Sequence, residues 1–161
     1  MQKTSIMKHS KLLNKTYEIR RPRLDDWDQM LSILEKENFS NIGGEEMREF
    51  PLKDCFIATC GKEVIGLAGY KILDSNTAKT SLLAVKKKYR EMGIGILLQN
   101  TRIQFLRDEN IKVLYTNCDN EKVISWNMRH FGFEKTGTLI PKTESYGLDD
   151  KDAWVNLKLN L

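Results

Sequence analysis

Hydrophobic residues recur along the chain in two patterns, at helical spacing in some segments and in short segments bounded by turn residues in others. Apolar residues at helical spacing predict helices that begin near Asp25, Gly93 and Asn120, and a further short helix is expected at 45–50. This order of elements predicts a mixed α/β (α+β) fold with a single, mostly antiparallel central sheet flanked by helices. Short apolar segments bounded by turn residues predict the strands at 17–20, 55–60, 63–73, 77–85, 113–116, 133–139 and 153–159.

Each predicted helix has an apolar face that we expect to pack on the sheet. Gly132 is expected to end the third helix, and turns are expected at Gly61-Lys62 and at 74–76. The expected faces are Trp27, Met30, Leu31 and Leu34 in the first helix, Ile94, Leu97, Leu98, Thr101 and Phe105 in the second, and Ile124, Met128 and Phe131 in the third.

The composition is that of a globular domain with its own core, since 40% of the 161 residues are hydrophobic and 30% are charged. We expect a basic tail at 1–16 and a single domain at 17–161. No apolar run has the length of a membrane span, and the N-terminus lacks the apolar stretch of a secretory signal. These features favour a cytoplasmic protein.

Cysteines and histidines limit the chemistry that the chain can perform. Cys55, Cys60 and Cys118 are odd in number and contain no Cys-x-x-Cys pair, which favours reduced thiols. His9 and His130 are the two histidines, so a multi-histidine metal site is excluded and a Ser-His-Asp arrangement is disfavoured. We expect no metal site.

Basic residues gather in two segments of a chain whose net charge is +4. Either segment could contact nucleic acid through its phosphates. We instead favour a solvated tail and a local anion site, which would need the second segment alone. The first segment contains Lys3, Lys8, Lys11, Lys15, Arg20, Arg21 and Arg23, and the second contains Lys86, Lys87, Lys88 and Arg90.

The most informative motif covers residues 83–95, where an apolar strand leads through a polar loop into an amphipathic helix. Gly93 and Gly95 open that helix and allow the backbone to turn tightly and approach a ligand. The unpaired N–H groups of a first helical turn, together with the helix dipole, form an anion site that suits a diphosphate. Arg90 can add a charge-assisted contact.

Two other glycine-rich phosphate motifs do not fit this segment. A P-loop requires Gly-Lys-Ser/Thr, whereas Gly95 is followed by Ile96 and Leu97. A dinucleotide fingerprint requires a third glycine at the position of Leu98. A glycine-rich helix start that binds nothing is the remaining alternative, and the apolar strand and the Tyr89-Arg90 pair argue against it.

The pattern Leu-Ala-Val-x-x-x-Tyr-Arg-x-x-Gly-Ile-Gly at 83–95 resembles the coenzyme A motif of the GNAT superfamily of N-acetyltransferases. The order of predicted elements from Tyr17 to Leu159 is similar to that fold. The segments 120–123 and 131–133 resemble the second signature of the family, which is a looser pattern.

This resemblance implies acetyl-CoA as the cosubstrate and assigns roles to matching positions. The backbone of Leu83 and Val85 would pair with the pantetheine arm, and the Val85 N–H would face the thioester oxygen. The strands that contain Val85 and Val113 would splay apart to form the slot for the thioester. The implied cofactor-binding residues are Leu83, Ala84, Val85, Arg90, Glu91, Met92, Gly93, Ile94, Gly95, Ile96 and Asn120.

The catalytic positions depart from the family pattern. Lys79 occupies the position at which some members carry a glutamate, and Met128 occupies the position of a common tyrosine acid. Asn127, which could hold a water molecule, and Cys118, which follows the strand at 113–116, are our catalytic candidates. Tyr115 and Tyr146 remain as further acids. We favour direct transfer over an acyl-cysteine route, because proximity and a polarised carbonyl supply much of the acceleration.

The expected acceptor is a primary amine of a small molecule or a peptide. Carboxylates near the expected acceptor side would attract a cationic amine, although surface carboxylates often serve solubility alone. Because the usual acid and base are missing, a non-catalytic coenzyme A binding module for regulation or interaction is the alternative function. A homodimer is compatible with the sheet edges. The carboxylates in question are Glu45, Glu46, Glu49, Glu144, Asp149, Asp150 and Asp152.

Overall fold

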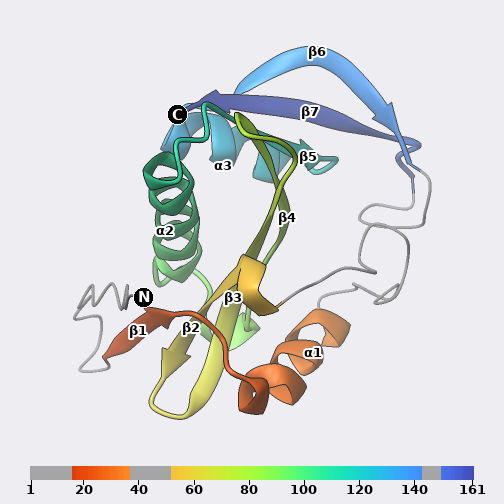
Figure 1. The fold of residues 1–161 in the computed structure, drawn as a ribbon. Helices are drawn as coiled ribbons and strands as arrows, with labels where there is room; N and C mark the ends of the chain where they lie inside the picture. The colour runs from red at the N-terminus through yellow and green to blue at the C-terminus, as the bar shows by residue number, and fades with distance from the viewer. Residues whose placement is uncertain (1–15, 37–51, 143–149) are drawn as a thin grey trace.

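A computed structural model of the chain describes residues 16–36, 52–142 and 150–161. These residues form a seven-stranded sheet with the order β1-β2-β3-β4-β5-β7-β6 (Figure 1). Every neighbouring pair is antiparallel except β4 and β5, which are parallel. The elements are β1 (Tyr17–Arg20), η1 (Leu24–Asp26), α1 (Trp27–Lys36), η2 (Leu52–Asp54), β2 (Cys55–Cys60), β3 (Glu63–Ile72), β4 (Thr77–Val85), η3 (Lys87–Tyr89), α2 (Ile94–Asp108), β5 (Val113–Cys118), α3 (Glu121–Phe131), β6 (Glu134–Pro141) and β7 (Ala153–Asn160).

Local turn and capping residues set the boundaries of these elements. Gly61 adopts a left-handed conformation (φ +60°) in the tight turn between β2 and β3. The carboxylate of Asp74 accepts hydrogen bonds from the backbone before β4. The side chain of Asn120 accepts from the Lys122 N–H at 2.9 Å and so caps α3, which ends at Gly132 (φ +79°).

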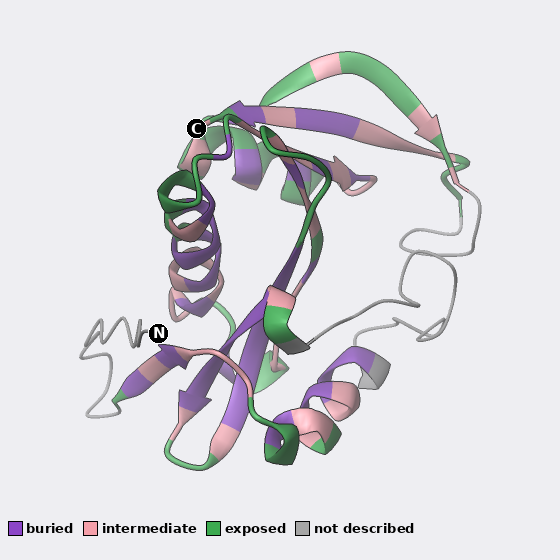
Figure 2. Cartoon of the chain, in the orientation of Figure 1, coloured by how far each residue is buried: buried purple, intermediate pink, exposed green. Residues whose placement is uncertain are grey.

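The sheet carries helices on both faces (Figure 1). α1 packs on one face over β3 and β4, and α2 packs on the other face over the same strands. α3 contacts β5 and β7. Figure 2 shows the buried residues along the sheet strands and on the sides of the helices that face the sheet. The core therefore has two parts, one under α1 and a larger one under α2 and α3.

β4 and β5 separate after a short parallel ladder. Their pairing covers only 77–79 of β4 and 113–115 of β5. Beyond it, β4 continues to pair with β3 as far as Val85, and β5 continues with β7 as far as Cys118. The hydroxyls of Thr80 and Thr116 lie 2.6 Å apart where the two strands diverge. The predicted splay between these strands is therefore present, and it opens the sheet beyond Thr80.

The elements agree with the predicted ones to within one or two residues where the structure describes them, and the helix expected at 45–50 lies outside the described residues. The predicted face of α3 was wrong at one position. Met128 is 39% exposed, whereas its neighbour Asn127 is 3% exposed and faces the core with Ile124. An amide can take a core position when its hydrogen bonds are made inside the protein, as those of Asn127 are.

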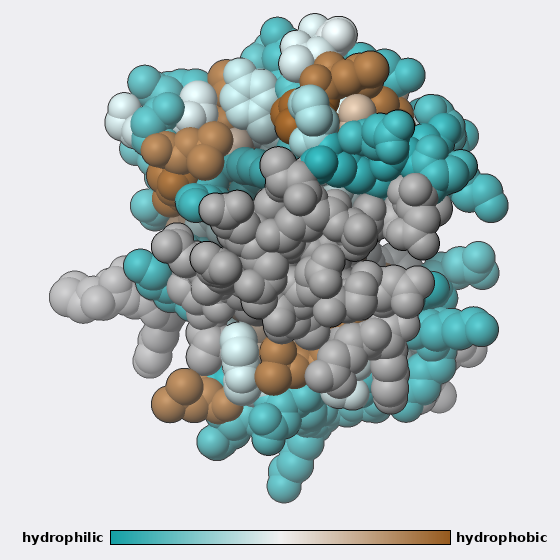
Figure 3. All heavy atoms as spheres, turned by 90° about the vertical axis from the view of Figure 1, so that its right-hand side faces the viewer, coloured by the Kyte–Doolittle hydropathy of each residue, from teal (hydrophilic) through white to brown (hydrophobic). Residues whose placement is uncertain are grey.

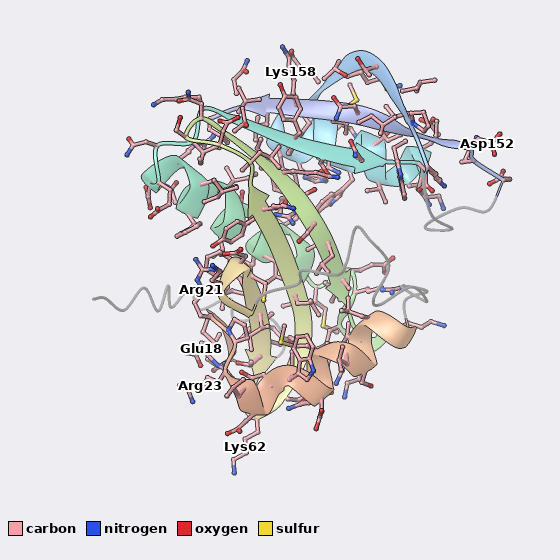
Figure 4. All side chains as sticks on the ribbon, turned by 45° about the vertical axis from the view of Figure 1, so that its right-hand side comes forward. Glu18, Arg21, Arg23, Lys62, Asp152 and Lys158 are labelled. Carbon is pink, nitrogen blue, oxygen red and sulfur yellow. The ribbon has the colours of Figure 1, made fainter. Side chains whose placement is uncertain are left out.

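Two described basic residues near the N-terminus, Arg20 and Arg21, have side-chain partners within the fold. Arg20 forms a two-bond ion pair with Asp26 at 2.7 and 2.9 Å. The guanidinium of Arg21 lies 3.9 Å from the centre of the Phe56 ring and 4.5 Å from that of Phe105. Figure 4 shows Arg21 near β1, far from Lys158 on β7. These contacts commit Arg20 and Arg21 to the fold, whereas the four lysines of the first basic segment lie outside the described residues.

On the face shown in Figure 3, the described residues are mostly hydrophilic, and the hydrophobic ones among them form small separate groups. None of the helices within the described ranges is both long and apolar enough to cross a membrane. The large hydrophobic residues with high exposure are Leu24, Ile72, Leu73, Val123, Met128 and Leu139.

Candidate functional site

A pocket of about 670 Å³ lies where β4 leaves β5, between the start of α2 and the exposed side of α3. Its size is within the range of small-molecule sites. Three elements form its walls: the end of β4, the loop into α2, and α3. The lining residues are Leu83, Ala84, Val85, Tyr89, Arg90, Glu91, Gly93, Gly95, Ile96, Asn120, Val123 and Trp126.

Residues 86–93 form the loop between β4 and α2, which we call the glycine loop. This loop has the backbone geometry of an anion site. Glu91 (φ +62°) and Gly93 (φ +80°) are both left-handed, and such turns commonly aim successive N–H groups at one point. The first helical bond runs from the Leu97 N–H to the Gly93 carbonyl at 3.0 Å. The N–H groups of residues 94–96 therefore have no partner inside the helix, and the dipole of α2 makes this end electropositive.

Gly95 brings the first turn of α2 close to α3. A Cβ atom at this position would lie 3.8 Å from the Trp126 ring, which itself lines the pocket. The φ angle of Gly95 is not left-handed, so glycine is not required here for its backbone conformation. Its missing side chain instead allows the first turn of α2 to approach α3.

Two of the three lysines in the glycine loop are paired with a carboxylate of the protein, which makes them less available to a ligand. The Glu63 carboxylate, at the start of β3, accepts hydrogen bonds from Lys86 Nζ at 3.0 Å and from the Tyr89 hydroxyl at 2.7 Å. Lys88 Nζ lies 3.1 Å from the same carboxylate. Arg90 uses its Nε to donate to the Val85 carbonyl at 3.0 Å. Glu63 thus attaches the loop to the β2–β3 hairpin.

Hydrogen bonding at Glu63 shifts two pKa values in opposite directions. Donation by Tyr89, Lys86 and Lys88 lowers the pKa of Glu63 to about 2. The same carboxylate raises the pKa of Tyr89, chiefly because it accepts a hydrogen bond from the protonated hydroxyl. Tyr89, which lines the pocket, therefore stays protonated at neutral pH with its hydroxyl directed to Glu63.

Cys118 and Asn127 do not line the pocket and are buried behind it. Burial raises the pKa of the Cys118 thiol to about 11, so it is protonated at neutral pH. Asn127 Nδ2 donates to Cys118 Sγ at 3.7 Å and to the Val123 carbonyl at 3.0 Å, and its Oδ1 accepts from Gln99 Nε2 at 3.0 Å. Both of its N–H donors are committed inside the protein.

Gln99 connects Asn127 to Arg102, a buried cation that the sequence pattern did not single out. Arg102 is 2% exposed, and Gln99 Oε1 accepts hydrogen bonds from its Nε at 2.9 Å and from its Nη2. Its Nη1 donates to the carbonyls of Gly69 at 2.6 Å and Leu82 at 2.9 Å. Burial lowers the pKa of Arg102 to about 9, which still leaves it charged at pH 7. Arg102, Gln99, Asn127 and Cys118 form what we call the buried network.

The pocket brings together most of the residues assigned from the sequence. Met92 and Ile94 are outside its lining, since Met92 Sδ accepts from the Tyr17 hydroxyl at 3.7 Å and Ile94 is in the core. Sequence reasoning missed Tyr89 and Val123 as lining residues. The Tyr-Arg pair and the i, i+3 spacing of Val123 and Trp126 were the available signals.

The remaining candidates are not part of this pocket. Tyr115 alternates along β5 with the core residue Leu114 and so lies on the other face of the sheet. Tyr146 and five of the seven carboxylates expected near the acceptor lie outside the described residues, whereas Asp150 and Asp152 are described and exposed. No group of acidic, histidine or cysteine side chains suited to a metal ion occurs within the described ranges.

Comparisons with known proteins agree on one fold. Residues 13–133 match the acetyltransferase (GNAT) family. The chain is similar to the solved structure of Ard1 from Thermoplasma volcanium, with 20% identity and a TM-score of 0.74 over 90% of this chain and 97% of that one. A comparison with curated protein sequences finds no match.

Two further solved structures are similar in fold. The ribosomal-protein-S18-alanine N-acetyltransferase from Escherichia coli is 17% identical, with a TM-score of 0.68 over 90% of this chain and 94% of that one. A GNAT family acetyltransferase from Elizabethkingia anophelis, solved with acetyl-CoA bound, is 17% identical, with a TM-score of 0.69 over 90% and 98% of the two chains.

Proposed function

Because the chain belongs to the GNAT acetyltransferase family, we propose that it transfers the acetyl group of acetyl-CoA to a primary amine of a small molecule or a peptide. The observation that carries this proposal is the position of the pocket. It joins the N-terminal end of α2 and the glycine loop to the opened edge of β4. A diphosphate and a thioester joined by an extended arm would need both features in one cavity.

The residues present fit acetyl-CoA. The backbone N–H groups at the start of α2, with Gly93, Gly95 and Arg90, would hold the diphosphate. The edge of β4 at Leu83 and Val85 is not paired with β5 and would bond the arm, with the Val85 N–H toward the thioester oxygen. Asn120 and Trp126 would contact the arm from α3. Acetyl-CoA itself supplies an acetyl group activated as a thioester.

We propose direct attack in a ternary complex. The amine nitrogen forms a bond to the carbonyl carbon, the carbon–sulfur bond breaks, the thiolate leaves, and the amine proton passes to solvent. The Val85 N–H would stabilise the charge that develops on the oxygen. The acyl-cysteine route is disfavoured because Cys118, with its raised pKa, is not a thiolate at neutral pH. Replacing Cys118 by alanine should leave transfer intact.

The first test is the melting temperature with and without acetyl-CoA. Ligand at about 100 times its dissociation constant stabilises by about 2.7 kcal/mol, which raises the midpoint of a domain of this size by about 5 to 10 °C. The double variant Gly93→Asp/Gly95→Asp should lose this rise, because two carboxylates then occupy the anion site. Gly137→Asp is the matched control: this glycine is also left-handed (φ +83°) but lies on β6, and its variant should keep the rise.

A non-catalytic coenzyme A binding module is the second candidate function. One observation favours it: within the described lining, the hydroxyl of Tyr89 is committed to Glu63, and no other neutral acid is present. Mass spectrometry of a panel of amines incubated with protein and acetyl-CoA separates the two functions. A rise in melting temperature without any acetylated amine supports the module. No rise in the folded parent protein contradicts both functions.

A further inference from the structure

The buried network is a continuous hydrogen-bonded path through the interior of the protein. It begins at the carbonyls of Gly69 on β3 and Leu82 on β4, passes through Arg102 and Gln99 on α2, and reaches Asn127 on α3. From Asn127 it ends on the sulfur of Cys118 and the carbonyl of Val123. The path therefore joins two neighbouring strands, the two helices beside the pocket and the end of β5.

Burying such a polar path in a protein interior costs free energy. Arg102 carries a full charge at neutral pH, yet each of its hydrogen-bond acceptors within the described residues is a neutral oxygen. Burying a charge without an opposite charge costs more than burying a hydrophobic side chain of similar size. A leucine or methionine at this position would fill a core more cheaply. The presence of arginine therefore calls for a role beyond filling space.

The location of Arg102 indicates that role. The register of β3 against β4 shifts here, because Gly69 pairs with Leu82 while the next residue, Tyr70, pairs with Thr80. Ser81 is thus the extra residue of a bulge, and bulges bend the strand that carries them. Arg102 bonds the carbonyls of both residues on the pocket side of this shift. Beyond the shift, Leu83 to Val85 form the pocket wall.

The far end of the path lies on another wall of the same pocket. Asn127 accepts from Gln99 on α2 and donates to the carbonyl of Val123, whose side chain lines the pocket. Three walls, formed by β4, α2 and α3, are thus connected by side chains that do not themselves line the pocket. Backbone pairing does not hold β4 at this opening, because β4 and β5 pair only at 77–79 and 113–115.

We propose that Arg102, Gln99 and Asn127 are positioning residues that set the width of the thioester end of the pocket. They hold the bulged part of β4 and the first turns of α3 at the separation that the acetyl end of acetyl-CoA requires. This inference rests on the proposed function. The network does not reach the glycine loop, so it governs the thioester end and leaves the diphosphate end unchanged.

The test compares two ligands that use different parts of the pocket. Acetyl-CoA would occupy both ends, whereas ADP presents only the nucleotide and the diphosphate. The variants Gln99→Met and Asn127→Leu keep side-chain volume and remove the bond between α2 and α3. We expect each to weaken acetyl-CoA binding about 10-fold in calorimetric titrations, with ADP affinity, measured by ligand-observed NMR, within twofold of the parent.

Two further variants make the test specific. Arg102→Lys keeps a donor and a charge at the same position, and we expect it to retain more acetyl-CoA affinity than Arg102→Met. Thr101→Val is the matched control, because Thr101 is buried on the same helix but donates to the Leu97 carbonyl within that helix. It should bind both ligands as the parent does. Melting curves establish that each variant is folded.

The outcomes separate this inference from the function on which it rests. Failure of the folded parent to bind acetyl-CoA overturns the proposed function and this inference with it. Parental binding with acetyl-CoA affinity unchanged in both Gln99→Met and Asn127→Leu overturns the inference alone. An equal loss of acetyl-CoA and ADP affinity also overturns it, because the network would then support the whole fold and not one end of the pocket.

Discussion

The glycine loop and the buried network both contain cations near the candidate pocket, but in different surroundings. In the glycine loop, Lys86 and Lys88 share the Glu63 carboxylate at the surface, where the Lys88 side chain is 64% exposed. In the buried network, Arg102 lies in the core and bonds neutral oxygens. The glycine loop balances its charges with an opposite charge at the surface, whereas Arg102 relies on neutral oxygens of the backbone and of the Gln99 side chain.

Because of this difference in surroundings, we expect the two regions to contribute differently to ligand binding and to stability. Surface ion pairs are screened by water and salt and are worth about 0 to 1 kcal/mol. Buried polar groups that lose a partner cost about 1 to 3 kcal/mol each. Changes in the glycine loop should therefore alter ligand binding more than stability, whereas changes in the buried network should alter stability as well.

The largest effect is expected for Arg102→Met. Three acceptors, on Gly69, Leu82 and Gln99, lose their donor, while removal of an unpaired buried charge offsets part of that cost. We expect the free energy of unfolding to fall by about 2 to 3 kcal/mol in urea denaturation. Arg107→Met, at an exposed position of the same helix, should change it by about 0.5 kcal/mol or less.

An Arg102→Met variant as stable as the parent would contradict the expectation that the buried network contributes to stability. The desolvation cost of the buried cation would then equal or exceed the value of its hydrogen bonds, as happens for some buried ion pairs. The selective loss of acetyl-CoA affinity in the same variant would still measure its effect on the pocket.

A smaller, pH-dependent effect is expected for Glu63→Gln. The folded-state pKa of Glu63 lies below its ordinary value of 4.5, at about 2. Its charged form is therefore stabilised by folding, and this stability is present above pH 4.5 and lost as the pH falls toward 2. Because the site is partly exposed, we expect a difference of about 1 kcal/mol between parent and variant at pH 7.

The stability difference between parent and Glu63→Gln should disappear between pH 4.5 and 2, as followed by urea denaturation at each pH. Glu109→Gln, at an exposed position after α2, serves as the control and should show a smaller difference. A difference for Glu63→Gln that stays constant down to pH 2 would show that the carboxylate contributes by shape and not by charge.

The smallest effect on stability, with an opposite effect on binding, is expected for Gly95→Ala. Alanine has a higher helix propensity than glycine, and the added Cβ meets Trp126 at an ordinary contact distance of 3.8 Å. The unfolding free energy should rise by about 0.5 kcal/mol, while acetyl-CoA affinity falls because the methyl group lies in the pocket wall. Gly93→Ala, at φ +80°, should instead lower stability.

A Gly95→Ala variant that gains stability and binds acetyl-CoA as well as the parent would show that the backbone at this position does not contact the ligand. Calorimetric titration beside urea denaturation measures both quantities on the same protein.

The sequence by itself determined the features that depend on neighbouring residues. The turn at Gly61, the cap at Asn120 and the stop at Gly132 were predicted because each acts within a few residues of its own position. The glycine loop was predicted for the same reason, since Gly93 caps α2 and Gly95 lies in its first turn. The fold class was predicted because strands appear as short apolar segments bounded by turn residues, and both signals lie within a few residues of each other.

Only the tertiary structure decided which polar residues are buried. Asn127 and Arg102 are ordinary surface residue types, and their burial depends on acceptors supplied by residues up to 33 positions away. Lys86 and Lys88 appeared as free cations until the fold brought Glu63, 23 and 25 residues away, against them. A hydrogen bond between distant segments leaves no periodic signal in the chain, because its partners meet only after the strands and helices have packed.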